Sequence, residues 1–121
     1  MRNIRNGQAY EESFWDWTFL NECFGDSGIR PTDIDGLIER KGHLLFIETK
    51  APGQPIPIGQ QRTFNALCAK GSTVLVIWGP KNHTQRAQWW GYPIQAANNE
   101  KVKAWVREWF LWADRDFAPT T

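Results

Sequence analysis

The stretch that decides the fold runs from Asp33 to Lys50 and reads "DIDGLIERKGHLLFIETK". It holds two apolar runs, residues 34–40 and 43–50, and the dipeptide Lys41-Gly42 between them is suited to a tight turn. The pattern therefore predicts a β-hairpin. Both predicted strands also carry acidic residues, and an unpaired buried charge is costly, so these acids need either solvent or a partner.

The register of this hairpin brings two acids together. A two-residue loop pairs Arg40 with His43, and counting back along both strands places Asp35 opposite Glu48. Alternation along the strands puts Asp35, Glu48 and Lys50 on one face of the sheet. Two opposed carboxylates repel each other unless a cation lies between them. Carboxylate oxygens suit a hard divalent cation, so the spacing predicts a Mg²⁺ site beside Lys50.

The rest of the chain predicts helices and strands around this hairpin. We expect a helix from about Ala9 to Gly25, a loop in "APGQPIPIG", a helix from about Gly59 to Ala69 and a buried central strand in "STVLVIWG". The segment "PKNHTQRAQWWGYP" is expected to be irregular or a short edge strand. A last helix is expected from a cap at Asn98 or Asn99 to Asp114, with an inner face made of Val102, Trp105, Val106, Trp109 and Trp112.

The predicted order is α-β-β-α-β-(β)-α, which is a mixed α/β fold with a small central mixed β-sheet flanked by helices. The chain has 121 residues, of which 41% are hydrophobic and 22% charged, so we expect one soluble globular domain over residues 1–121. The net charge of +1 does not mark a nucleic-acid binder, although local basic patches could still form on the surface.

Composition also gives an expected location. Cys23 and Cys68 have no metal or redox spacing, and we expect lone thiols that fill core space in a reducing cytoplasm. No apolar run approaches the roughly 18 residues of a membrane span. The opening "MRNIRNGQAY" has no apolar signal core, so neither a membrane partner nor export is expected.

With Asp35 on one strand and Glu48-Thr49-Lys50 on the next, the chain resembles the PD-(D/E)XK nuclease superfamily. The resemblance is closest to archaeal-type Holliday junction resolvases and VRR-type nucleases, whose leading helix opens with a G-x-A-x-E pattern. Here "GQAYE" matches that pattern at residues 7–11 and supplies Glu11, with Glu12 as the alternative. Ile34 replaces the usual proline, which leaves Asp33 as an alternative to Asp35.

The resemblance implies a restriction-endonuclease-like core and a Mg²⁺-dependent deoxyribonuclease in which Mn²⁺ can substitute. The metal would be held by Asp35, Glu48, the carbonyl of Thr49 and Glu11. Lys50 would orient or deprotonate the nucleophile. The glutamine that follows the lysine strand in many members of the family would be Gln60 or Gln61.

We therefore expect an endonuclease that cleaves duplex or branched DNA, with a junction or flap as the sharper version of the substrate. A homodimer would follow from a four-way junction, because its symmetry demands two active sites. Two alternatives stay open: a non-catalytic DNA- or protein-binding module on the same fold, and an RNA-directed nuclease. Six basic residues are candidates for a DNA track: Arg5, Arg30, Arg62, Lys70, Lys81 and Arg86.

Overall fold

A computed structural model describes residues 15–115 of the chain. The chain divides into two compact units, residues 1–33 and 34–121. The single domain expected over residues 1–121 stays a prediction. None of the helices in residues 15–115 has the length and apolar character that crossing a membrane requires.

In the first unit the structure describes one helix, η1 (Trp17–Phe24), which is a 3-10 helix. The Asp16 side chain caps its start by accepting a hydrogen bond from the amide of Thr18, and Gly25 ends it with a φ of 61°. The sequence predicts an α-helix that ends at the same glycine. No residue of η1 is buried, so it lacks the packed apolar face that stabilises most α-helices.

The second unit is a mixed α/β fold, as predicted. Its elements are β1 (Gly36–Arg40), β2 (His43–Lys50), α2 (Ile58–Ala69), β3 (Thr73–Trp78), β4 (Arg86–Trp89), β5 (Gln95–Ala96) and α3 (Asn99–Asp114). The strands form one five-stranded sheet in the order β1-β2-β3-β4-β5. The β2–β3 pair is parallel and all other pairs are antiparallel, so the sheet is mixed.

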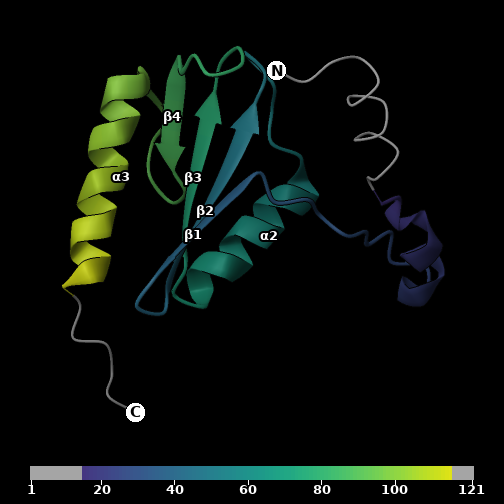
Figure 1. Cartoon of the computed structure of the whole chain (residues 1–121). Coiled ribbons are helices and arrows are strands. Elements are labelled where there is room, and N and C mark those ends of the chain that lie inside the picture. Colours follow the sequence, from purple (N-terminus) through teal and green to yellow (C-terminus); the bar gives the residue numbers. More distant parts are fainter. Residues whose placement is uncertain (1–14, 116–121) are drawn as a thin grey trace, which may run out of the picture. The chain divides into compact units, whose positions relative to one another are not determined.

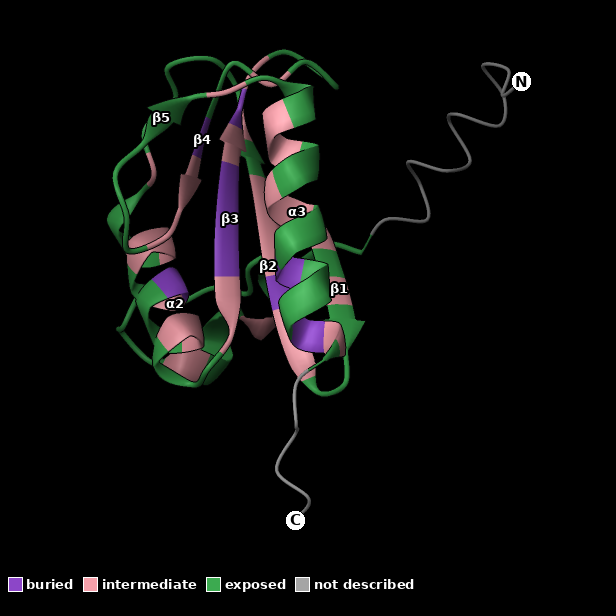
Figure 2. Ribbon diagram, turned by 90° about the vertical axis from the view of Figure 1, so that its left-hand side faces the viewer, coloured by how far each residue is buried: buried purple, intermediate pink, exposed green. Residues whose placement is uncertain are grey.

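Helices α2 and α3 lie on opposite faces of this sheet (Figure 1). The face under α3 holds one core cluster, in which Leu45, Leu75 and Ala87 pack against Trp109 and Ala113. The face under α2 holds another, formed by Phe64, Val74, Val76 and Trp78. Figure 2 shows that β3 contributes most of the buried strand residues, as the predicted central strand should.

Two strand predictions need correction. The segment that follows β3 was expected to be irregular or a short edge strand, but β4 pairs with β3 on one side and β5 on the other. The edge strand beside β4 is β5, which is only two residues long, and β1 forms the other edge of the sheet. β1 begins at Gly36, two residues after its predicted start at Ile34, whereas β2 has its predicted bounds.

Helix α3 has its predicted cap and end. Asn98 is the N-cap, and its side chain accepts a hydrogen bond from the amide of Lys101. At the other end, Arg40 of β1 pairs with the Asp114 carboxylate, and this hydrogen bond holds the pKa of Asp114 below its ordinary value. The predicted inner face is largely correct, except that Trp112 is 44% exposed and packs against the ring of His43.

The cap makes a testable contribution to stability. Asn98→Ala is expected to lower the free energy of unfolding by about 1 kcal/mol, because the Lys101 amide loses its acceptor. Asn98→Asp should retain the wild-type value, since aspartate caps helices equally well. Urea denaturation of the three proteins measures the difference. Equal stability of the alanine and aspartate variants would show that the cap contributes nothing.

The two thiols differ in their surroundings. Cys68 is partly buried and packs against the cluster under α2, as expected of a core thiol, and burial raises its pKa. Cys23 lies in η1 and is exposed, so the expectation that both thiols fill core space is wrong for Cys23.

Candidate active site

The hairpin has the register that a two-residue turn predicts. Arg40 pairs with His43, and the ladder continues to Gly36 opposite Ile47. Both turn residues have positive φ, 51° at Lys41 and 85° at Gly42, as a type I′ turn requires. The ladder ends at Gly36, so Asp35 lies just outside it and forms no backbone pair with Glu48.

Asp35 lies just before β1 and reaches across to β2. Its Oδ2 accepts hydrogen bonds from the Thr49 amide at 2.9 Å and from the Thr49 hydroxyl at 3.1 Å. Asp35 therefore contacts Thr49, whose side chain points to the opposite face of β2 from that of Glu48. Asp33, the alternative acid, is exposed and belongs to the other unit.

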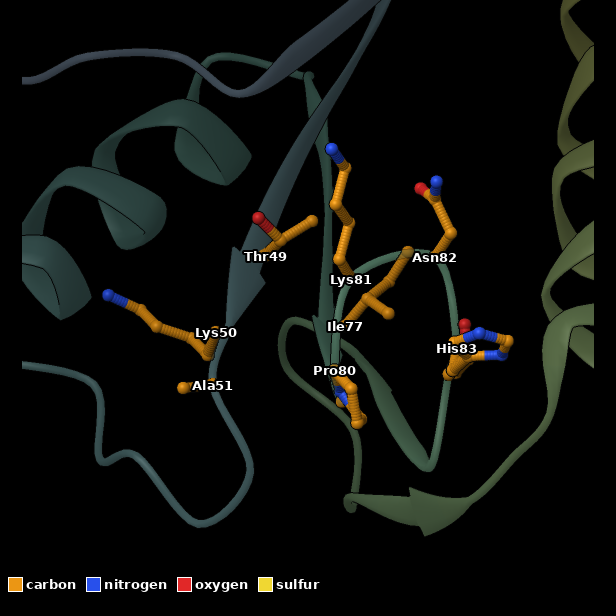
Figure 3. Close-up of a pocket in the computed structure, with 10 residues that line it drawn as sticks. Thr49, Lys50, Ala51, Ile77, Pro80, Lys81, Asn82 and His83 are labelled. Atoms are coloured by element: carbon orange, nitrogen blue, oxygen red, sulfur yellow. The ribbon is translucent and has the colours of Figure 1, made fainter.

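The charge on Glu48 is compensated by its neighbours. Lys50 Nζ lies 3.4 Å from Glu48 Oε2, and the two side chains are only 8% and 13% exposed. Both face the side of the sheet that α2 covers, and in Figure 3 the Lys50 side chain points toward that helix. A partly buried carboxylate and ammonium tolerate burial because each neutralises the other.

Helix α2 distinguishes the two candidate glutamines. Gln60 donates from Nε2 to Glu48 Oε2 at 2.8 Å, so it belongs to the same cluster as Lys50. Gln61 is turned to the preceding loop, where its Nε2 donates to the carbonyl of Ile56 at 2.9 Å. The structure therefore brings Gln60, and not Gln61, to Glu48.

Gln60 also leaves one polar atom unsatisfied. Its Oε1 is buried and accepts no hydrogen bond from residues 15–115, although buried polar atoms are normally paired. The end of β2 thus holds the Glu48 carboxylate and the spare amide oxygen of Gln60 on one face, and the Asp35 carboxylate with the Thr49 hydroxyl on the other. These are hard oxygen donors, which is the chemistry that Mg²⁺ or Mn²⁺ requires of its ligands.

The third acid predicted to hold the metal lies in the N-terminal segment. Glu11, and its alternative Glu12, lie outside the described residues. Over residues 15–115, no three side chains of histidine, cysteine, aspartate or glutamate come together as a metal-binding group. The described acids at the site are Asp35 and Glu48.

Sequence reasoning missed the segment of residues 79–85, which lies at the end of β3 next to Thr49. This segment helps to line a pocket of about 460 Å³ at the end of β2. Its sequence, "GPKNHTQ", reads as an irregular connection, and the one signal in it was Lys81, a candidate for the DNA track. The neighbouring loop of residues 51–57 is fixed as well, because Trp78 Nε1 donates to the carbonyl of Gln54 at 2.7 Å.

No protein-family model, curated protein or solved structure matches this chain. The chemistry of the site and the arrangement of the strands are therefore the grounds on which a function is proposed.

Proposed function

We propose that this chain is a metal-dependent nuclease of the PD-(D/E)XK type that hydrolyses phosphodiester bonds in DNA. The observation that carries the proposal is the cluster at Glu48, where Lys50 and Gln60 both contact one carboxylate oxygen while Asp35 contacts the intervening Thr49. In a chance Glu-x-Lys tripeptide on a strand, the two charged side chains would be expected to lie in solvent, whereas here they are 8% and 13% exposed and Glu48 also contacts a glutamine of a separate helix.

The arrangement of the strands supports a restriction-endonuclease-like core. An antiparallel hairpin, β1–β2, is followed by the crossover through α2 and a parallel strand, β3. In open α/β sheets ligands bind beyond the carboxyl ends of the parallel strands. Glu48 and Lys50 are in the last three residues of β2, at that end of the sheet.

Asp35, Glu48 and the carbonyl of Thr49 would hold Mg²⁺, with Mn²⁺ as a substitute. A divalent cation at this place would polarise the scissile phosphate and favour ionisation of the attacking water. Gln60 Nε2 orients Glu48, while its unsatisfied Oε1 is suited to accept a hydrogen bond from a water molecule.

Lys50 supplies the positive charge of the site. Its ammonium is nearly buried, so water screens it little, and it offsets negative charge that develops on the phosphate oxygens. The same ammonium would donate a hydrogen bond to an attacking water beside Glu48 and so orient the nucleophile.

The test is a cleavage panel with the purified protein. Duplex, flap, single-stranded and four-way DNA, together with matching RNA strands, are incubated with Mg²⁺, with Mn²⁺ or with EDTA. We expect cleavage of at least one DNA substrate with either cation and none with EDTA. The pattern across substrates reports any structure specificity, and cleavage of RNA alone would favour the RNA-directed alternative. Intact substrates in every metal-containing reaction would contradict the proposal.

Gln60 and Gln61 form a matched pair for a finer test. Gln60→Ala is expected to lower the single-turnover cleavage rate by about 10- to 100-fold, because residues that orient a ligand typically contribute that much. Gln61→Ala should lower the free energy of unfolding by about 1 kcal/mol through loss of its bond to Ile56, with little change in rate. Equal cleavage rates for the two variants would show that the contact between Gln60 and Glu48 does not contribute to the rate.

A further inference from the structure

We propose that the pocket between the end of β2 and residues 79–84 binds the sugar–phosphate backbone of the nucleic acid, with Lys81 as its phosphate ligand. The inference rests on the proposed function and adds a second contact for the substrate. It would lie beside the Asp35–Thr49 contact, on the other side of β2 from the Lys50 side chain (Figure 3).

The pocket lies where α/β sheets bind ligands. Its volume is about 460 Å³, and its walls come from the ends of the parallel strands β2 and β3 and from the segment that follows β3. Pockets of roughly 300–1,000 Å³ at the carboxyl ends of such strands are typical of ligand sites. Thr49, which contacts Asp35, is part of its wall, so the pocket adjoins the Asp35–Thr49 contact.

The charge of the wall favours an anion. Its lining residues include Lys81, His83 and the backbone end of Lys50 but no aspartate or glutamate. The side chain of Lys81 extends alongside Thr49 in Figure 3. Three other lysines of the unit pair with acids: Lys41 with Asp114, Lys50 with Glu48 and Lys103 with Glu100. Within residues 15–115 Lys81 has no such acid, so its ammonium is available for a phosphate.

The segment that presents Lys81 is held in a fixed shape. The Gly79 amide donates to the carbonyl of Lys50 at 3.0 Å, which ties the segment to the end of β2. The amides of His83 and Gln85 donate to the carbonyls of Pro80 and Trp78 at 2.9 and 2.8 Å. A fixed segment binds a ligand without first losing conformational freedom, which is the advantage of preorganisation.

The first residue of helix α3 holds the same segment from the other side. The Asn99 Oδ1 accepts a hydrogen bond from the Thr84 amide at 2.8 Å, and its Nδ2 donates to the carbonyl of Asn82 at 2.8 Å. At Gly79, where φ is 156°, any Cβ would lie 2.0 Å from the carbonyl oxygen of His83. The chain therefore folds back too tightly here for any residue except glycine.

The experiment measures binding apart from cleavage. Fluorescence anisotropy of short end-labelled DNA duplexes, DNA single strands and RNA single strands is recorded in EDTA, from about 50 to 200 mM salt. We expect Lys81→Ala to weaken binding about threefold or more and to reduce the slope of log K against log salt by about one. Comparison of the DNA and RNA arms shows which backbone the pocket accepts.

Lys103→Ala is the matched control, because it removes the same charge from a side chain that is 63% exposed on α3. Lys81→Arg should bind as the wild type does, since it retains the charge. The inference is overturned if Lys81→Ala binds as tightly as Lys103→Ala, or if the wild type binds none of the probes. Selective loss of binding in Lys81→Ala, with no cleavage by the wild type in Mg²⁺ or Mn²⁺, would uphold the pocket and reject the proposed nuclease.

Discussion

Replacing Glu48 by glutamine is expected to abolish metal-dependent cleavage, with a fall of about three orders of magnitude or more in the single-turnover rate. The amide keeps the size of the side chain and a hydrogen-bond acceptor for Gln60, but it removes the negative charge that would hold the cation. The measurement pairs the cleavage rate with the rise in melting temperature that Mn²⁺ produces. That rise should disappear together with activity, because a ligand stabilises only a native state that binds it.

The same variant has a structural consequence that repulsion between acids would not predict. From the sequence, removal of one of two opposed carboxylates should leave the metal-free protein as stable or slightly more so. In the structure Glu48 neutralises Lys50, so Glu48→Gln is expected to cost roughly 1–3 kcal/mol of unfolding free energy. Glu100→Gln is the matched control, because this carboxylate of α3 is 79% exposed. It should change neither the cleavage rate nor the free energy of unfolding. Wild-type cleavage by the Glu48 variant would remove Glu48 from the site.

Truncating Lys50 to alanine is expected to separate cation binding from chemistry. Cleavage should fall by about 10²- to 10³-fold, because the transition state loses a nearly unscreened positive charge. Binding of Mn²⁺ should survive and its affinity should equal or exceed that of the wild type, since the ammonium no longer competes for Glu48 Oε2. Isothermal titration with Mn²⁺ and single-turnover cleavage on the same preparation test both parts.

Lys103→Ala serves as the control here too, and it should keep wild-type cleavage with a stability change within about 0.5 kcal/mol. Retained cleavage in Lys50→Ala would reduce Glu48-Thr49-Lys50 to a chance tripeptide. Loss of Mn²⁺ binding would instead mean that Lys50 is needed to hold Glu48 in position, so that its contribution to rate is indirect.

The hairpin and its register were predictable because a two-residue turn determines which residues of the two strands pair. Lys41-Gly42 gives a two-residue loop with positive φ at both positions, and that loop fixes which residues of β1 and β2 face each other. The central position of β3 was equally clear from its continuous apolar run, which is rich in β-branched residues. These features depend on residues close in the sequence, or on hydrophobicity alone.

Contacts between distant segments were not predictable in the same way. The sequence left Gln60 and Gln61 as equal candidates, because a helix turned by one residue would exchange them. The choice depends on how α2 packs on the sheet, where Phe64 is buried against Val74 and Val76. Likewise, the sequence predicted that the segment containing β4 would be at most an edge strand of the sheet. Nothing in the sequence shows that the two residues of β5 would pair with β4 and extend the sheet by one strand.

The parallel pairing of β2 with β3 also bears on how the protein folds. The hairpin β1–β2 closes over two residues, whereas β2 meets β3 only after the loop of residues 51–57 and helix α2 have been traversed. Closing that longer loop costs chain entropy before any pairing rewards it, so this ladder should form late and set the folding rate. Glu48 lies in β2 and Gln60 in α2, within that crossover. The cluster at Glu48 is therefore assembled in the slow step of folding, together with the core.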